Sequence, residues 1–305
     1  MKKKISFIFI IVLTFIPYLT SFANWFFTPA DVNALHSKPA NYTINYGSDP
    51  KQIAQLRLPE TPGPHPVAMI IHGGCWTHAF ADLNNTAALA DALRDLGFAT
   101  WNIEYRGTDD KGGAWPGTFE DVANAADYLR TIATKYSLDL NKIIVIGHSA
   151  GGHLALWLAG RHNLPTNSPL YKANPISFRG IISLGGVPDL QSFRKHSQDI
   201  CGTDIVSALL GPKEDEITKR LPQTSPAAML PLKMEQILIY GTDDKVTPDD
   251  LSSYIKASKR AGDRIKLIKI PFAAHFEYLV PNSVTWPILV YEARSLISDP
   301  SQAVG

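Results

Sequence analysis

A serine flanked by small residues stands where an apolar strand pattern changes into an apolar helix pattern. The stretch is Gly147-His148-Ser149-Ala150-Gly151, which has the form Gly-x-Ser-x-Gly. In a sharp strand-to-helix turn the serine takes a strained backbone conformation, and the residues two positions away must be small to avoid collision. The turn lifts the hydroxyl group to the N-terminus of a helix, which favours negative charge. This pattern predicts that Ser149 is a nucleophile.

A serine hydroxyl group needs a general base, normally a histidine that a carboxylate orients. The chain supplies both after the serine, each directly behind a strand pattern. Asp243 and Asp244 follow the run QILIYGT, and His275 follows IKLIKIPF. Loops at the carboxyl ends of parallel strands bind the ligands of open α/β sheets. We predict His275 as the base and Asp244 as its acid. Asp243 is the alternative acid, because only one of two adjacent side chains can reach the imidazole.

Backbone N–H groups are the third requirement, because the tetrahedral intermediate of acyl transfer carries a negative oxygen. The segment IHGGCW follows the strand pattern PVAMII, and its glycines let the backbone approach a substrate closely. We predict oxyanion donors at the N–H groups of Gly74, Cys75 and Ala150. Trp76 and His148 are candidates for lining the substrate pocket.

The other histidines show no metal-ligand spacing. His72 is expected to brace the oxyanion loop, and His148 and His153 are expected to pack against the turn at Ser149 or hydrogen-bond it. The rest are scattered along the chain, at His36, His65, His78, His162 and His196. We therefore expect neither a metal nor a cofactor.

Runs that are apolar on both faces alternate with helix patterns along the chain. Strands are predicted at residues 42–47, 52–58, 66–74, 98–105, 142–149, 180–186, 236–242 and 265–272. Helices are predicted at residues 85–97 with Asn85 as N-cap, 118–137 with a Thr-x-x-Asp cap, 248–262 and 286–296. The alternation predicts an α/β fold, with a mostly parallel central sheet of about eight strands and helices on both faces.

The first residues have the layout of a secretory signal peptide. Three lysines precede an apolar run from Ile5 to Leu19, and Ser21-Phe22-Ala23 offers a small-residue cleavage site. We predict cleavage after Ala23, a secreted or periplasmic location, and no stable membrane span afterwards. The alternative, an uncleaved anchor, needs a run of roughly 18 to 20 apolar residues. Residues 24–305 are expected to form one domain. Within it, residues 187–233 fit either an ordinary connection or a small cap over the pocket.

Charge and cysteine content narrow the range of partners. The chain has 29 basic and 28 acidic side chains, and three of the basic ones are the lysines at positions 2–4. This balance argues against a nucleic-acid partner, which requires a basic surface. In an oxidising compartment Cys75 and Cys201 could form a disulfide bond, but free buried thiols fit the sequence equally well.

Four segments carry a resemblance to a known family. HGGCW, GHSAGGHLA, GTDDKVTP and AAHFEYL resemble segments of α/β-hydrolase esterases of the hormone-sensitive-lipase and feruloyl-esterase-like (BD-FAE-like) type, including relatives of kynurenine formamidases. The resemblance covers residues 42–296 and implies the α/β-hydrolase fold without a cofactor. Residue by residue it implies Ser149 as nucleophile, Asp244 as acid, His275 as base and the oxyanion donors given above. Cys75 departs from lipase-type relatives, which often carry a third glycine there.

Together these features predict a serine hydrolase that cleaves small carboxylic esters through an acyl-enzyme. An amidase or formamidase uses the same machinery and stays open. So does an exopeptidase, although enzymes of that kind usually carry an additional propeller domain, for which we find no sequence. A non-catalytic binding module on the same fold is the remote alternative, because such a protein would be expected to lack one of the catalytic residues. The physiological substrate and the oligomeric state stay open.

Overall fold

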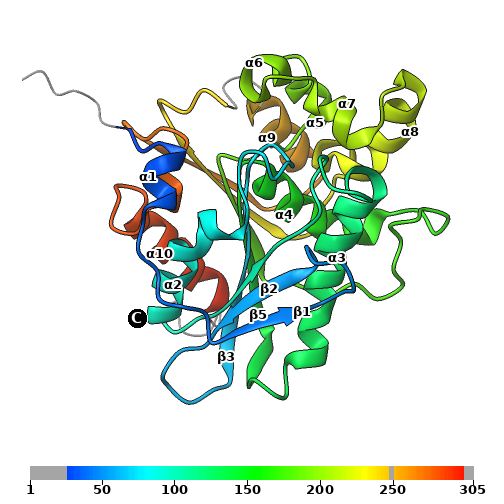
Figure 1. Cartoon of the computed structure of the whole chain (residues 1–305). Helices are drawn as coiled ribbons and strands as arrows, with labels where there is room; N and C mark the ends of the chain where they lie inside the picture. The colour runs from blue at the N-terminus through cyan, green and yellow to red at the C-terminus, as the bar shows by residue number, and fades with distance from the viewer. Residues whose placement is uncertain (1–25, 247–250, 299–305) are drawn as a thin grey trace, which may run out of the picture.

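The computed structural model describes residues 26–246 and 251–298 (Figure 1). The predicted signal peptide and the first residues of the helix predicted at 248–262 lie outside the described residues. Each helix in the described ranges falls short of the length and apolar character that crossing a bilayer requires.

An eight-stranded, mostly parallel sheet forms the centre of the molecule. Its strands are β1 (Tyr42–Asn45), β2 (Ile53–Arg57), β3 (His65–Ile71), β4 (Ala99–Ile103), β5 (Leu138–His148), β6 (Gly180–Leu184), β7 (Glu235–Gly241) and β8 (Ile265–Ile270). They lie in the order β1-β2-β4-β3-β5-β6-β7-β8. β2 pairs antiparallel with β1 and β4, and the other neighbours are parallel. All eight predicted strands and the parallel character of the sheet are confirmed.

The continuous apolar runs arise because both faces of the sheet are covered. Successive strand residues point to opposite faces, and in β3 they enter two different cores. Val67, Met69 and Ile71 belong to one core, whereas Ala68 and Ile70 belong to the other. A strand of this kind has no polar face, so its sequence shows no alternation.

Helices cover each face of the sheet (Figure 1). One core includes residues of α3 (Ala114–Ile132), α4 (Ala150–Gly160) and α9 (Leu251–Arg260). The other includes residues of α1 (Pro29–Asn33), α2 (Ala87–Asp95) and α10 (Trp286–Ile297). α4, directly behind Ser149, is buried along its whole length, which explains why its sequence is apolar all round.

The start of α2 differs from the prediction. A 3₁₀ helix, η1 (Leu83–Thr86), precedes it, and the side chain of Asp82 caps that helix by accepting from the N–H of Asn84. α2 itself begins at Ala87. Asn85 is therefore not an N-cap, and its side chain instead donates a hydrogen bond to Asn33 of α1. The Asn85 side chain thus binds another helix, and Asp82 serves as the cap.

The start of α3 also differs from the prediction. The helix begins at Ala114, four residues before the expected cap, and is kinked at Trp115, whose ψ of 131° is not helical; Thr118 lies inside it. The Thr118 hydroxyl donates to the carbonyl oxygen of Arg106 at 2.6 Å. The Asp121 carboxylate, expected to complete the cap, instead accepts two hydrogen bonds from the Arg106 guanidinium. Both side chains hold the Arg106 loop to the helix rather than capping it.

Segment 187–233 folds into short helices that lie together at one corner of the molecule (Figure 1). They are α5 (Leu190–Phe193), α6 (Ser197–Cys201), α7 (Ile205–Leu210), α8 (Glu214–Thr224) and the 3₁₀ helix η3 (Pro226–Ala228). The indole N–H of Trp157 in α4 donates to the carbonyl oxygen of Gln223 at 2.9 Å. The segment is thus attached to the helix that carries the nucleophile turn.

Candidate active site

Ser149 is the single residue between β5 and α4. Its backbone lies at φ 52° and ψ −119°, in the left-handed region that non-glycine residues rarely adopt. Its N–H donates to the carbonyl oxygen of Leu184 on the neighbouring strand at 2.9 Å. The conformation is therefore held by a bond to β6, as expected of a strained residue that the surrounding structure fixes.

The two glycines of the motif are required by close backbone contacts. A Cβ atom added to Gly147 would lie 2.1 Å from the carbonyl oxygen of Gly151. One added to Gly151 would lie 2.2 Å from the carbonyl oxygen of Ile71. Only glycine fits at either position, which agrees with the steric reasoning from the sequence.

Asp244 and His275 meet at the carboxyl ends of β7 and β8. Nδ1 of His275 lies 3.0 and 3.1 Å from the two carboxylate oxygens of Asp244. Burial by itself would raise the pKa of Asp244, but the hydrogen bond and charge of His275, with further donors, hold it below its ordinary value. The neighbouring Asp243 accepts from the hydroxyl group of Thr242 instead. The structure thus places Asp244, and not Asp243, against the imidazole.

His275 and Ser149 face the same cavity. Because Nδ1 of His275 is turned toward Asp244, Nε2 is the nitrogen left for the serine. Across the described part of the chain, Ser149 and the imidazole are not joined by a hydrogen bond. Such contacts are often long without substrate and tighten in the reacting complex.

The loop after β3 brings unusual backbone to the cavity. Gly74, Cys75 and Trp76 are three successive residues with positive φ, at 90°, 51° and 56°. Within the described ranges we find no protein acceptor for the N–H groups of Gly74, Cys75 or Ala150. All three residues line the cavity beside Ser149. The three predicted oxyanion donors therefore lie beside Ser149, and within the described ranges each N–H group is free of a protein acceptor.

Glu104, which the sequence did not single out, holds this loop in shape. Its Oε1 lies 2.7 Å from Nε2 of both His72 and His78, and its Oε2 accepts from the N–H of Leu83 at 3.0 Å. Burial opposes ionisation, yet these partners outweigh it and hold the pKa of Glu104 far below its ordinary value. The contact between His72 and Glu104 is the arrangement that the expected bracing of the oxyanion loop by His72 requires.

The same residues bring metal-ligating atoms together. Those of His72, His78 and Glu104 lie within 4.8 Å of one another, and so do those of His78, Asp109 and Asp110. The spacing of these residues along the chain does not predict the clusters, because the donors come from separate segments. His78 is already occupied, with Nε2 on Glu104 and Nδ1 on Asp110. Hydrogen bonds within the group satisfy these side chains, and the absence of a metal stays a prediction.

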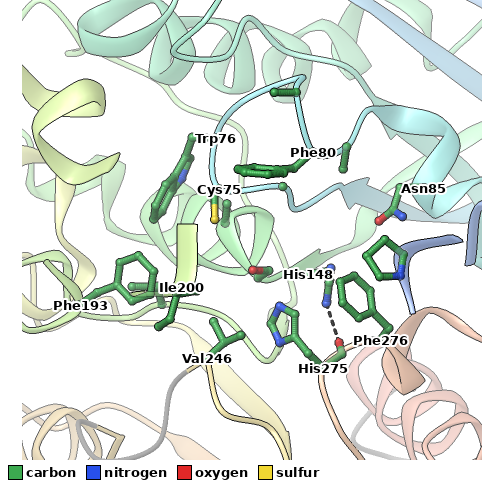
Figure 2. Close-up of a pocket in the computed structure, with 17 residues that line it drawn as sticks. Cys75, Trp76, Phe80, Asn85, His148, Phe193, Ile200, Val246, His275 and Phe276 are labelled. Carbon is green, nitrogen blue, oxygen red and sulfur yellow. Dashed lines mark hydrogen bonds between the residues drawn. The ribbon is translucent and has the colours of Figure 1, made fainter. Parts of the chain in front are cut away.

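Two buried histidines flank the nucleophile turn. His148 donates from Nε2 to the carbonyl oxygen of His275 at 2.8 Å (Figure 2), and burial with the nearby His275 lowers its pKa to about 3. His153 accepts from the indole N–H of Trp76 at 3.1 Å and donates to the carbonyl oxygen of Thr224 at 2.8 Å. Burial lowers the pKa of His153 to about 4. Both rings are neutral near pH 7, and both connect loops of the site.

The cavity at Ser149 has a volume of about 330 Å³ and mostly apolar walls (Figure 2). Trp76 and His148, the two predicted pocket residues, both line it. The other large side chains come from several loops and short helices: Phe80, Asn85, Val187, Phe193, Ile200, Val246 and Phe276. Segment 187–233 contributes Val187, Phe193 and Ile200, so it forms one wall of the cavity.

A disulfide bond joins Cys75 and Cys201, which are 126 residues apart in sequence. Cys75 belongs to the oxyanion loop and Cys201 ends α6 of segment 187–233. The bond ties the wall of the cavity to the predicted oxyanion donors. Of the two alternatives that the sequence left open, the structure contains the bonded form.

The sheet and the serine turn define an α/β-hydrolase fold. The family model BD-FAE matches residues 55–258, about two thirds of the chain, and the chain belongs to this family. The expected relationship to kynurenine formamidases stays a prediction.

Named relatives agree with this assignment. Esterase LipC of Mycobacterium tuberculosis is 36% identical over 132 residues, which cover 43% of this chain and 31% of LipC. A probable isoprenylcysteine alpha-carbonyl methylesterase of Oryza sativa subsp. japonica is 24% identical over 252 residues, covering 79% of this chain and 59% of the rice protein. The chain therefore spans only part of the length of these relatives.

Solved structures share the fold. Esterase B from Lactobacillus Rhamnosis superposes with a TM-score of 0.75 at 18% identity, covering 90% of this chain and 92% of its own. A truncated carbohydrate esterase from gut microbiota superposes with a TM-score of 0.67 at 23% identity, covering 86% and 99%. At these identities the likeness supports the fold alone.

Proposed function

We propose that the protein hydrolyses carboxylic esters through an acyl-enzyme formed on Ser149. The observation that carries the proposal is the convergence on one cavity of three features: a strained serine, an imidazole bound to a buried carboxylate, and free backbone N–H groups. The esterase names of the relatives support the reaction class.

In the proposed reaction Oγ of Ser149 attacks the ester carbonyl carbon while Nε2 of His275 takes its proton. Asp244 holds Nδ1–H and stabilises the imidazolium. The N–H groups of Gly74, Cys75 and Ala150 bind the negative oxygen of the tetrahedral intermediate. The C–O bond to the alcohol then breaks, and His275 returns the proton to the leaving alkoxide. Water, deprotonated by His275, releases the acid in the second half of the cycle.

The test is hydrolysis of p-nitrophenyl acetate, butyrate and octanoate, combined with labelling by a fluorophosphonate probe. The wild-type protein should release p-nitrophenol and take up the probe, and Ser149→Ala should lose both. Ser253→Ala, at an exposed serine of α9, is the matched control and should keep both. Labelling without ester turnover would contradict esterase activity while leaving the nucleophile in place. A folded wild-type protein with neither signal would contradict the whole proposal.

We further propose that the chain is exported and cleaved after Ala23. The layout of residues 1–23 supports this, and so does the disulfide bond, because such bonds persist mainly in oxidising compartments. N-terminal sequencing of the protein recovered from the periplasm or medium should begin at Asn24. A product that begins at Met1 in a membrane fraction would contradict cleavage.

A further inference from the structure

The cavity at Ser149 has two chemically different sides. Figure 2 shows Trp76, Phe193, Ile200 and Val246 on one side, and Phe80, Asn85, His148 and Phe276 on the other. Among the described residues that line it, no lysine, arginine, aspartate or glutamate is present. The cavity therefore fits an uncharged group, since a buried charge would need a charged or strongly polar partner.

Asn85 is the one amide among the lining residues described. The residue is buried, with 5% of its surface exposed. Its Nδ2 donates a hydrogen bond to Oδ1 of Asn33 at 3.1 Å. Its Oδ1 has no hydrogen-bond partner within the described ranges, and Figure 2 shows this oxygen on the side of the amide that faces the cavity. This oxygen is open to the cavity, so a donor on a bound group can pair with it without displacing a protein partner.

The orientation of this amide is fixed from outside the cavity. Asn33 ends α1, whose Val32 is 2% exposed and packs in the same core as α2. The hydrogen bond to Asn33 uses the Asn85 NH₂ group, so the carbonyl end is turned to the cavity. Reversing the Asn85 amide alone would place two oxygens against each other. In the arrangement present, Asn85 offers an acceptor to the cavity.

We infer that Asn85 is a specificity-determining residue, whose Oδ1 accepts a hydrogen bond from a hydroxyl or N–H group on an otherwise apolar, uncharged substrate. The inference rests on the proposed ester hydrolysis at Ser149. The aromatic rings of Phe80 and Phe276 flank this side of the cavity and supply apolar contact around the donor. A substrate without the donor leaves Oδ1 unpaired in the complex, and the site discriminates against it for that reason.

The experiment compares two pairs of esters that differ by one hydroxyl group. Ethyl hexanoate and ethyl 6-hydroxyhexanoate place it on the acyl chain, whereas hexyl acetate and 6-hydroxyhexyl acetate place it on the alcohol chain. The ratio of kcat/KM within each pair is measured for the wild-type protein, Asn85→Leu and Asn33→Ala. Asn84→Leu, at the exposed neighbouring residue, is the matched control.

In one of the two pairs, Asn85→Leu should shift the ratio away from the hydroxylated ester by about tenfold, the effect of one neutral hydrogen bond. Asn33→Ala, which leaves the cavity wall intact, should shift the same ratio in the same direction by a smaller factor. Asn84→Leu should keep the wild-type ratio. Ratios that stay unchanged in both Asn85→Leu and Asn33→Ala would overturn the inference while leaving ester hydrolysis intact.

If Asn85→Leu fails to fold, Asn33→Ala decides the matter alone. A wild-type protein that hydrolyses neither these esters nor p-nitrophenyl butyrate would contradict the proposed function itself, and the inference would fall with it. Fluorophosphonate labelling of Ser149 distinguishes that outcome from a loss of folding.

Discussion

The hydroxyl group of Tyr278 donates a hydrogen bond to Oδ2 of Asp244 at 2.9 Å, and the same oxygen lies 3.0 Å from Nδ1 of His275. Tyr278 is 1% exposed, and its oxygen also accepts from the N–H of Gly241 at 2.5 Å. Burial and the Asp244 charge raise the pKa of Tyr278 far above its ordinary value, so the group stays a donor. The tyrosine therefore shares the carboxylate with the proposed base.

Tyr278→Phe should move the acidic limb of the pH dependence of kcat/KM to higher pH. The Tyr278 hydroxyl is one of the donors that hold the pKa of Asp244 below its ordinary value, so without it the carboxylate is protonated at a higher pH. The shift should be a few tenths of a unit to about one unit, the range for one neutral hydrogen bond. Profiles of p-nitrophenyl butyrate hydrolysis between about pH 4 and about pH 9 measure it. Tyr291→Phe, at an exposed residue, is the control, and identical acidic limbs in all three proteins would refute this role.

Glu104→Gln should lower kcat by about tenfold to a hundredfold, with KM changed much less. The carboxylate joins His72, His78 and Leu83, so its loss loosens the loop that carries Gly74 and Cys75. Removal of a complete oxyanion donor costs about a hundredfold to a thousandfold, and misplacement should cost less. Steady-state kinetics with p-nitrophenyl butyrate measure both constants.

Glu60→Gln, at an exposed glutamate, is the control for Glu104→Gln and should behave like the wild-type protein. Circular dichroism checks that Glu104→Gln is folded. A folded variant with wild-type kcat would show that Glu104 does not position the loop.

The strands, the serine turn and the glycines around it could be predicted because each follows from local sterics or from burial on both faces. Glu104 and Asn85 could not. Glu104 acts on histidines 26 and 32 residues away, and no local pattern relates them. Asn85 looked like an N-cap, because asparagine often caps helices, yet its partner Asn33 lies 52 residues away. The order of the strands in the sheet decides which loops lie next to each other. That order cannot be read from the spacing of residues along the chain.

The Cys75–Cys201 bond should stabilise the protein and its activity together. The double variant Cys75→Ser/Cys201→Ser should lose about 2–4 kcal/mol of unfolding free energy, as is usual for disulfides that close long loops. It should also lose kcat, because segment 187–233 is released from the oxyanion loop. Urea denaturation and ester kinetics measure the two effects. A reductant should cause both losses in the wild-type protein and leave the double variant unchanged. If the reductant affects the double variant equally, the losses do not come from this disulfide bond.

His153 should make the protein less stable as the pH falls from about 6.5 toward 4. Burial lowers its pKa to about 4 from 6.5, so between these values the unfolded chain binds a proton that the folded protein excludes. At pH 5 this costs about 2 kcal/mol of unfolding free energy relative to pH 7.5. His153→Gln removes the titrating group while its amide can still accept from Trp76 and donate to Thr224. The difference in unfolding free energy between the two pH values, from urea denaturation, should therefore shrink by about 2 kcal/mol.

Trp76→Phe is the matched control, because it removes the indole donor and leaves the His153 imidazole in place. It should lower stability at both pH values and keep most of the wild-type difference between them. If His153→Gln keeps that difference as well, the acid sensitivity comes from other groups. If only His153→Gln loses it, protonation of the buried His153 imidazole is the source of the acid sensitivity.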